Sequence, residues 1–334
     1  MCEQQYLFDY VLGYRSPSNK KADKGTIVHK ILEILAFVKF TIQKNEQTFE
    51  DDILGKINVY NYDLDDIIDR VYNFYTSHFT HHEWKDVDHR DCKKWSYKAI
   101  EYAGGMFDPR NRTILYPEQR FDITIEKPWA EYEYELPSGE KLKGHLSIKG
   151  TIDLITKPSD NTLEIVDWKT GRRLDWATGQ EKTQEKLETD PQLMIYYYAA
   201  QKLYPEIDHC IVTIYFINDG GPFSMTFDKS HLQKTEDLLR EKFYKIKQSN
   251  KPRLSKTWKC RKLCHYGKNT FQGHDSILPM LEYREGQVCN PGYNMTMCEQ
   301  VAHDIKTKGL KNVVDEYTVP GYNVGHYQAP GSTE

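Results

Sequence analysis

The chain has 334 residues, 39% hydrophobic and 28% charged, which is enough for one elaborated domain or two modest ones. Mean hydropathy is -0.73, and the longest apolar run, ILEILAFVKF, is about half the length of a spanning helix and contains Glu33 and Lys39. A net charge of -4 means that any polyanion site must be local. The first residues lack the pattern of a secretion signal, and seven cysteines in so long a chain favour metal ligands or free thiols. We therefore expect a cytoplasmic protein without a membrane segment.

The first third of the sequence predicts helices. KGTIVHKILEILAFVKF places apolar residues at helical spacing, and it sets His29 and Glu33 one turn apart on the same face. From about 45 to 105, polar stretches alternate with apolar positions such as Ile67, Ile68 and Val71. This texture predicts a helical insertion ahead of the main sheet.

From about residue 114 the pattern changes to strands separated by turn signals. The expected strands are ILYPEQRFDITIE, AEYEYEL, HLSIKGTIDLIT and LEIVDWKTG, followed later by HCIVTIYFIND and its partner PFSMTFD. Asp190 and Pro191 can begin a helix that Pro205 ends, and HLQKTEDLLREKFYKIKQ predicts an amphipathic helix. After about residue 310, Gly and Pro predict an irregular tail.

A basic segment runs from Arg240 to Lys268, with eleven Lys or Arg residues and one acidic residue, Glu241. The commonest meaning of such a run is a solvated helix face followed by a loop. The alternative is a surface that follows nucleic-acid phosphates, with aromatic residues such as Trp258 and Tyr266 stacking on unpaired bases.

Two strands carry a group of charged residues. Asp167 and Lys169 lie two apart on a strand, so their side chains project to one face. The turn KPSDNT allows Asp153 to fold back beside Asp167. Two converging carboxylates repel one another, and a hard divalent cation relieves that repulsion. A nearby lysine then stabilises charge on a phosphoryl group.

These residues resemble the PD-(D/E)XK nucleases of the RecB type, which include nuclease domains of bacterial recombination helicases and CRISPR adaptation exonucleases. The resemblance rests on four motifs that occur in the family's order, from residue 25 to about 205. They are G-x-x-x-H at Gly25 to His29, G-x-x-D at Gly150 to Asp153, D-x-K at Asp167 to Lys169, and Q-x-x-x-Y at Gln192 to Tyr196.

The resemblance implies a role for each motif residue. Asp153, Asp167 and the backbone carbonyl of Trp168 would bind Mg²⁺ or Mn²⁺, and Lys169 would be the catalytic lysine. His29 would be a further metal ligand, and the alternative is that it is a core histidine. Glu33 would act through a water molecule or by contacting the metal ligands without binding the metal itself. Gln192 and Tyr196 would face the scissile phosphate or the DNA backbone. The alternative for Tyr196 is that its ring is part of the aromatic core.

The cysteines extend the resemblance to nearly the whole chain. Related nucleases carry one cysteine before the core and three after it, which together hold a [4Fe-4S] cluster. Here Cys2, Cys260, Cys264 and Cys298 would fill those places, with Zn²⁺ as the competing occupant. Cys289 is the alternative to Cys298, and His265 could replace one thiolate, whereas Cys92 and Cys210 are expected to be buried thiols.

The sequence departs from the family pattern in two places. The usual C-x-x-C-x5-C ending is replaced by a C-x-x-x-C spacing and a distant third cysteine, Cys298. In addition, Cys2 follows Met1 directly, whereas related nucleases place an S-x-S-x-(L/F) helix before the first cysteine. The absent helix is expected to reflect either an N-terminal truncation or its true loss.

The expected fold is α/β: a restriction-endonuclease-like core with a central mixed sheet flanked by helices. The expected organisation is an N-terminal cysteine segment with the first core helix at 1–45, a helical insertion at 46–110, the nuclease core at 111–250, a basic and cysteine-containing region at 251–310 and a tail at 311–334.

The expected function is metal-dependent cleavage of DNA, by an exonuclease acting on DNA ends or single strands in recombination, repair or phage DNA metabolism. The alternatives are a non-catalytic DNA-binding scaffold and a site-specific endonuclease. The expected partner is DNA, single-stranded or with duplex ends, and the sequence identifies no protein partner.

Overall fold

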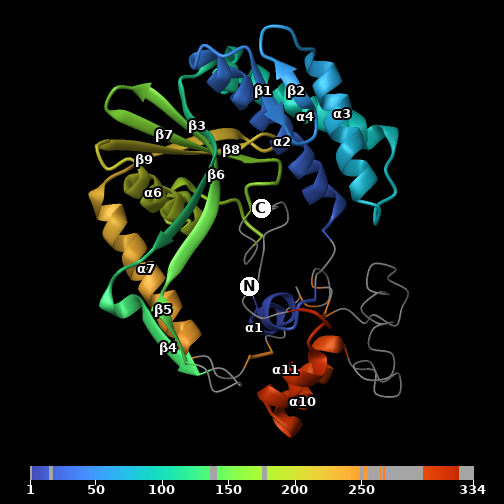
Figure 1. Ribbon diagram of the computed structural model, residues 1–334, viewed down its shortest axis with the longest axis vertical. Helices are drawn as coiled ribbons and strands as arrows, with labels where there is room; N and C mark the ends of the chain where they lie inside the picture. Colours follow the sequence, from blue (N-terminus) through green and yellow to red (C-terminus); the bar gives the residue numbers. More distant parts are fainter. Residues whose placement is uncertain are drawn as a thin grey trace. The chain divides into compact units, whose positions relative to one another are not determined.

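A computed structural model describes residues 2–14, 18–135, 141–174, 179–248, 252–254, 260, 264, 266–267 and 296–322. The chain divides into two compact units (Figure 1). Unit 1 comprises Met1–Ser18 and Ile246–Glu334, and unit 2 comprises Asn19–Lys245. Segments from both ends of the sequence therefore belong to one unit.

Unit 2 is built on a five-stranded mixed sheet in the order β3-β6-β7-β8-β9. Its strands are β3 (Ile114–Thr124), β6 (Ser147–Ser159), β7 (Thr162–Lys169), β8 (His209–Phe216) and β9 (Gly221–Phe227). Neighbouring strands are antiparallel except for β7 and β8, which run parallel. A parallel pair needs a crossover, and here it contains α5 (Gln184–Glu188) and α6 (Pro191–Leu203).

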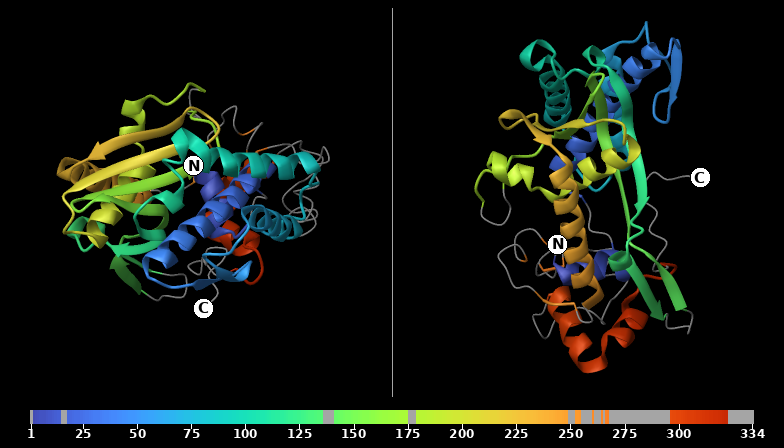
Figure 2. Two further views of the ribbon diagram at one scale, coloured as in Figure 1. Left: turned by 90° about the horizontal axis from the view of Figure 1, so that it is seen from above. Right: turned by 90° about the vertical axis from the view of Figure 1, so that its left-hand side faces the viewer.

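Helices cover both faces of the sheet (Figure 2). The core on one face includes residues of α2 (Lys20–Gln43), α3 (Leu64–His78) and α4 (Asp86–Glu101), with α3 packed on the other two helices, and the core on the other face includes residues of α6 and α7 (Lys229–Gln248). Side chains on β7 alternate between these cores: Ile165 belongs to the α6 side, whereas Val166 and Trp168 belong to the α2 side. The predicted α/β architecture is confirmed.

Two segments differ from the expectation. The predicted helical insertion begins with a hairpin, β1 (Thr48–Asp51) and β2 (Gly55–Asn58), which turns at Gly55 with a φ of 67° that glycine adopts at low cost. The predicted irregular tail begins with α11 (Leu310–Tyr317). Val313 and Tyr317 are four residues apart and both are buried, so tertiary packing stabilises this helix despite the Gly and Pro residues beyond it.

Unit 1 has its own apolar core, to which the π-helix Leu7–Val11, α10 (Met297–Lys308) and α11 contribute, and the short helix α1 (Glu3–Tyr6) precedes the π-helix. The remaining elements are a hairpin and three 3₁₀ turns in unit 2: β4 (Glu131–Glu135), β5 (Lys141–His145), Tyr102–Gly104, Pro109–Asn111 and Pro128–Ala130. None of the helices in the described part of the chain is long and apolar enough to cross a membrane.

Candidate active site

Asp153 and Asp167 come together across the antiparallel strands β6 and β7. The register pairs Leu154 with Val166, which places the two aspartates opposite one another. The backbone N–H of Trp168 donates a 2.8 Å hydrogen bond to Oδ2 of Asp153. The side chain of Asp167 is fully buried, and that of Asp153 is 13% exposed. The juxtaposition expected from the KPSDNT turn is therefore present.

Lys169 lies against Asp167, as their spacing on β7 predicts. Its Nζ is 2.8 Å from Oδ1 of Asp167 and 2.7 Å from Oδ2. Burial raises the pKa of both aspartates, and repulsion from Asp153 raises that of Asp167 further, while Lys169 opposes both shifts. The lysine thus offsets only part of the cost of holding two carboxylates together.

Helix α2 brings His29 to the same place. A Cβ atom on Gly25 would lie 2.6 Å from Oγ1 of Thr170, so any larger residue would require the Thr170 side chain to move and glycine lets the helix lie close to the end of β7. One turn later, Nδ1 of His29 lies 3.5 Å from Oδ2 of Asp153. Burial and then the charge of Lys169 lower the pKa of His29 to about 4, so its imidazole is neutral at pH 7.

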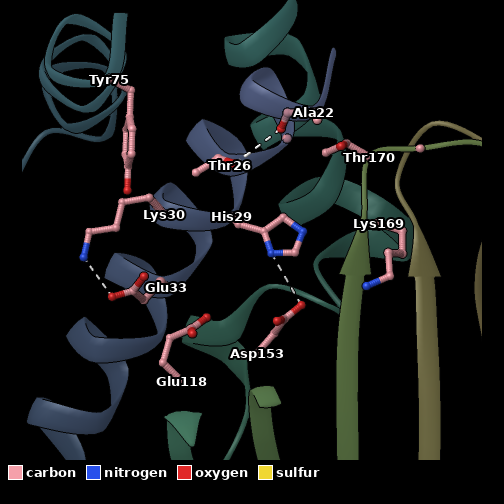
Figure 3. A pocket seen from close by; sticks show the side chains of 12 residues that line it. Ala22, Thr26, His29, Lys30, Glu33, Tyr75, Glu118, Asp153, Lys169 and Thr170 are labelled. Atoms are coloured by element: carbon pink, nitrogen blue, oxygen red, sulfur yellow. Dashed lines mark hydrogen bonds and ion pairs between the residues drawn. The ribbon is translucent and has the colours of Figure 1, made fainter. Parts of the chain in front are cut away.

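A cavity of about 390 Å³ opens beside these groups (Figure 3). His29 and Asp153 point toward one another in it, with Lys169 on the sheet side and Glu33 on the helix side. Asp167, Gln192 and Tyr196 do not line this cavity. Its lining residues are Ala22, Gly25, Thr26, His29, Lys30, Glu33, Tyr75, Glu118, Asp153, Lys169, Thr170 and Gly171.

Glu33 is held by a lysine. Nζ of Lys30 lies 2.8 Å from Oε1 of Glu33 and 2.8 Å from Oδ2 of Asp51, at the end of β1. Burial raises the pKa of Glu33, although Lys30 opposes the shift. Lys30 is therefore engaged by two acids, Glu33 and Asp51.

Sequence reasoning missed Glu118, which reaches the cavity from β3. The register pairs on either side, Pro117 with Leu154 and Gln119 with Ile152, set Glu118 across from Asp153. Its φ of 49° is uncommon for a residue other than glycine. Burial, then the charges of Asp153 and Glu33, raise its pKa to about 9. In the sequence it is one acid among several on a polar strand, and only the register reveals its position.

Helix α6 approaches Asp167 from the opposite side of the sheet. Nε2 of Gln192 lies 3.4 Å from Oδ1 of Asp167 and donates to the hydroxyl of Tyr196 at 2.8 Å. Gln192 is exposed. The Tyr196 ring is buried in the α6-side core, edge-on to Phe121. Tyr196 is therefore both a core aromatic residue and a hydrogen-bond partner of the residue that contacts Asp167.

The chemical type of these donors suits a hard divalent cation. Oδ2 of Asp167 is buried and accepts no hydrogen bond, since the ammonium of Lys169 lies close to it without hydrogen-bond geometry. Asp153, Asp167, Glu118 and Glu33 bring four carboxyl groups close together, and the cations near them include Lys169, Lys30 and Arg120. Carboxylate oxygens are preferred ligands of Mg²⁺, and the neutral imidazole of His29 adds a nitrogen donor.

The four predicted cysteine ligands all belong to unit 1. Gly267 donates its N–H to the carbonyl of Cys264, and a Cβ on Gly267 would lie 2.7 Å from the carbonyl oxygen of Cys260. The N–H of Cys298 donates to the carbonyl of Tyr266. These contacts gather three of the cysteines around residues 266–267.

Cys2 joins this group from the other end of the chain. Its Sγ lies 4.0 Å from the carbonyl oxygen of Arg253, and the N–H of Arg253 donates to the carboxylate of Glu3. Burial raises the pKa of Cys298, and the charges of Cys2, Cys264 and Cys260 raise it further, because the four thiols are neighbours. Thiolates of this kind are possible metal ligands, although no three of the four lie within 4.8 Å of one another in the described residues. Cys289 and His265 lie outside the described residues.

Cys92 and Cys210 are buried in α4 and β8, in the cores of unit 2. Burial raises the pKa of each thiol to about 12, together with nearby acidic charges in the case of Cys92. Their predicted role as buried thiols agrees with these positions.

One expectation for the basic segment is wrong. Tyr266 cannot stack on bases, because it is 1% exposed and its ring stacks on Phe8 at 4.3 Å. Within α7, Arg240 pairs with Asp237, and Lys245 pairs with Glu241. Lys256, Trp258, Lys259, Arg261 and Lys262 lie outside the described residues.

Comparison with known protein families agrees with this geometry. A family model of the PD-(D/E)XK nuclease superfamily matches residues 1–268, and because this is most of the chain, the protein belongs to that superfamily. Membership implies a metal-dependent nuclease, and such nucleases typically use Mg²⁺ or Mn²⁺. The predicted superfamily is therefore confirmed. No curated protein matches the chain.

Proposed function

We propose that this nuclease is a DNA exonuclease of the RecB-like type, acting on DNA ends or single strands. The observation that carries the proposal is the convergence of Asp153, Asp167 and Lys169 with His29 beside an open cavity. The cavity gives a phosphodiester access to Asp153 and Lys169, which line it.

In this proposal, His29, Asp153, Asp167 and the carbonyl of Trp168 hold Mg²⁺ or Mn²⁺. His29 is suited to this because its depressed pKa keeps a lone pair available at pH 7. His29 also interacts with the backbone of Trp168, which supports a position near that carbonyl. When bound, the cation would polarise the phosphate and lower the pKa of a water molecule.

Lys169 is the proposed catalytic lysine. Lys169 lines the cavity and its side chain is 32% exposed, so its ammonium can donate hydrogen bonds to a phosphate oxygen or to an attacking water. Asp167 positions this ammonium through contacts with both carboxylate oxygens. Gln192 and Tyr196 in turn fix the orientation of Asp167, and Glu33 orients water at the helix side of the cavity.

For unit 1 we propose a [4Fe-4S] cluster on Cys2, Cys260, Cys264 and Cys298, with Zn²⁺ as the competing occupant. The support is the proximity of the four thiols, which come from segments more than 250 residues apart in sequence. A centre with these ligands would join the two chain ends that form the unit.

The proposed substrate is DNA, processed in recombination, repair or phage DNA metabolism, and the basic segment would follow backbone phosphates. The test is incubation with end-labelled and circular DNA, single- and double-stranded, in Mg²⁺, Mn²⁺ and EDTA. Mononucleotide release from ends, with circles intact, is the expected result. Nicked circles would establish an endonuclease, and binding without metal-dependent cleavage would establish a scaffold; either result overturns the exonuclease proposal.

A further inference from the structure

A second group of possible metal ligands lies in unit 2, at the beginning of α2. Asp23 comes from the first turn of that helix, and His81 and His82 come from the segment between α3 and α4. One ligand atom from each of the three lies within 4.8 Å of the other two. These residues do not line the cavity of the candidate active site.

One of the two distances suits a small tetrahedral ion, and the other is that of a hydrogen bond. Nε2 of His81 lies 3.4 Å from Oδ2 of Asp23, and Nε2 of His82 lies 2.7 Å from the same oxygen. Zn²⁺ bonds of about 2.0–2.1 Å at tetrahedral angles separate ligand atoms by about 3.4 Å. The first contact has that spacing, and the second would have to open by about 0.7 Å.

The surroundings favour such a site. The side chain of Asp23 is 4% exposed, so its carboxylate is held in place, while that of His81 is 31% exposed and gives solvent a route to the group. The nearby ammonium groups are engaged by other acids: Lys20 lies 2.8 Å from Asp88, and Lys24 lies 2.7 Å from Asp91.

The structure assigns a Zn²⁺ site to Asp23, His81 and His82, with water completing the coordination. Two imidazoles and one carboxylate suit Zn²⁺, whereas Mg²⁺ prefers oxygen ligands. The ion would join the α3–α4 segment to the first turn of α2, the helix whose Ala22, Gly25 and His29 line the candidate active-site cavity. This site is independent of the nuclease proposal, since it shares no residue with the carboxylate centre.

The test is zinc binding by the whole chain after removal of loosely bound metal, measured by zinc content and by titration calorimetry. The parent is compared with Asp23→Asn and with the double variant His81→Ala/His82→Ala. The matched control is His78→Ala, an exposed histidine of the same region whose Nδ1 contacts the carbonyl of Phe74. The carboxylate and cysteine sites are the same in every protein compared, so differences report this site alone.

Parent and His78→Ala are expected to bind one more equivalent of Zn²⁺ than the double variant, or to bind it at least about 100-fold more tightly. Zinc at 100 times its Kd should raise Tm by about 5 °C in the parent and control but not in the variants. Asp23→Asn preserves side-chain volume, so it provides the comparison with the parent if the double variant folds poorly. Equal stoichiometry, affinity and Tm shift in all four proteins would overturn the assignment.

Discussion

The backbone N–H of Trp168 donates a 2.8 Å hydrogen bond to Oδ2 of Asp153, so the middle residue of the D-x-K motif fixes the carboxylate on the neighbouring strand. The Trp168 side chain is fully buried in the α2-side core, with its ring edge-on to that of His29 at 6.1 Å. One residue thereby connects the sheet carboxylate to the helix histidine through backbone and packing. The position of the Asp153 carboxylate and the position of the His29 ring therefore both depend on Trp168.

Replacing Lys169 with Ala is expected to reduce metal-dependent DNA cleavage by about 10²–10³-fold, because a donor to the phosphoryl group is lost. Asp167→Ala should abolish cleavage as well, while both variants remain folded. The control is Lys149→Ala, which removes an exposed lysine of β6 that pairs with Asp122. Initial rates on labelled DNA, with circular dichroism to check folding, test this. Parental rates in a well-folded Lys169 or Asp167 variant would show that the site is assigned wrongly.

In EDTA, Glu118→Gln is expected to raise Tm by roughly 3 °C at pH 8 and by less at pH 5. The folded state raises the pKa of Glu118 from 4.5 to about 9, so it binds a proton more tightly than the unfolded chain does. Stability of the metal-free protein therefore falls as pH rises between those values, and removing the charge removes that loss.

Thermal unfolding across pH 5–9 with and without Mg²⁺ checks this prediction. Glu126→Gln is the control, because Glu126 is an exposed acid just beyond the end of β3. Mg²⁺ should stabilise the parent more than Glu118→Gln, since a cation offsets the repulsion that the substitution relieves. The same Tm for the parent and Glu118→Gln at pH 8 would contradict it.

Several motif residues could be predicted because they lie close in sequence to their partners, whereas the position of His29 beside Asp153 followed from the family resemblance. The D-x-K spacing fixes one strand face, a short hairpin returns Asp153 to it, and i, i+4 spacing pairs Gln192 with Tyr196. Glu118 and Lys30 could not be predicted, since their positions depend on the register of β3 and on the hairpin that carries Asp51. The burial of Tyr266 likewise follows from packing against Phe8, 258 residues earlier.

Gln192→Ala is expected to lower kcat by about tenfold while leaving Tm nearly unchanged. The exposed amide contributes one hydrogen bond to Tyr196 and a longer contact to Asp167, and losing a hydrogen bond of about 1.4 kcal/mol corresponds to that factor. Tyr196→Phe should act similarly, since it keeps the buried ring and removes only the hydroxyl. Gln201→Ala, further along α6, is the control. An unchanged kcat in Tyr196→Phe would leave Tyr196 as a core residue alone.

Neutralising Lys256, Lys259, Arg261 and Lys262 with glutamine should weaken DNA binding and flatten its dependence on salt. Each phosphate contact contributes about 0.7 to the log-log slope on single strands. The control replaces Lys141 and Lys143, exposed residues of β5 that pair with Glu133. Binding titrations between 50 and 200 mM salt, roughly the range in which such contacts are lost, would measure both slopes. Equal slopes would mean that the four charges form only a solvated face.

Cys264→Ala should abolish the metal centre of unit 1 and lower Tm, because Cys2, Cys260, Cys264 and Cys298 come from both parts of the unit. Anaerobically purified parent should be brown, with broad absorption near about 400 nm and four iron atoms per chain, as a [4Fe-4S] centre requires.

Cys289→Ala and Cys92→Ala should keep colour and iron, the first because Cys298 is the expected ligand and the second because Cys92 is buried in α4. A colourless parent protein that contains one zinc would show that the site holds Zn²⁺ instead of a cluster, with the same four ligands. Parental iron in Cys264→Ala, or its loss in Cys289→Ala, would show that the ligand set itself is wrong.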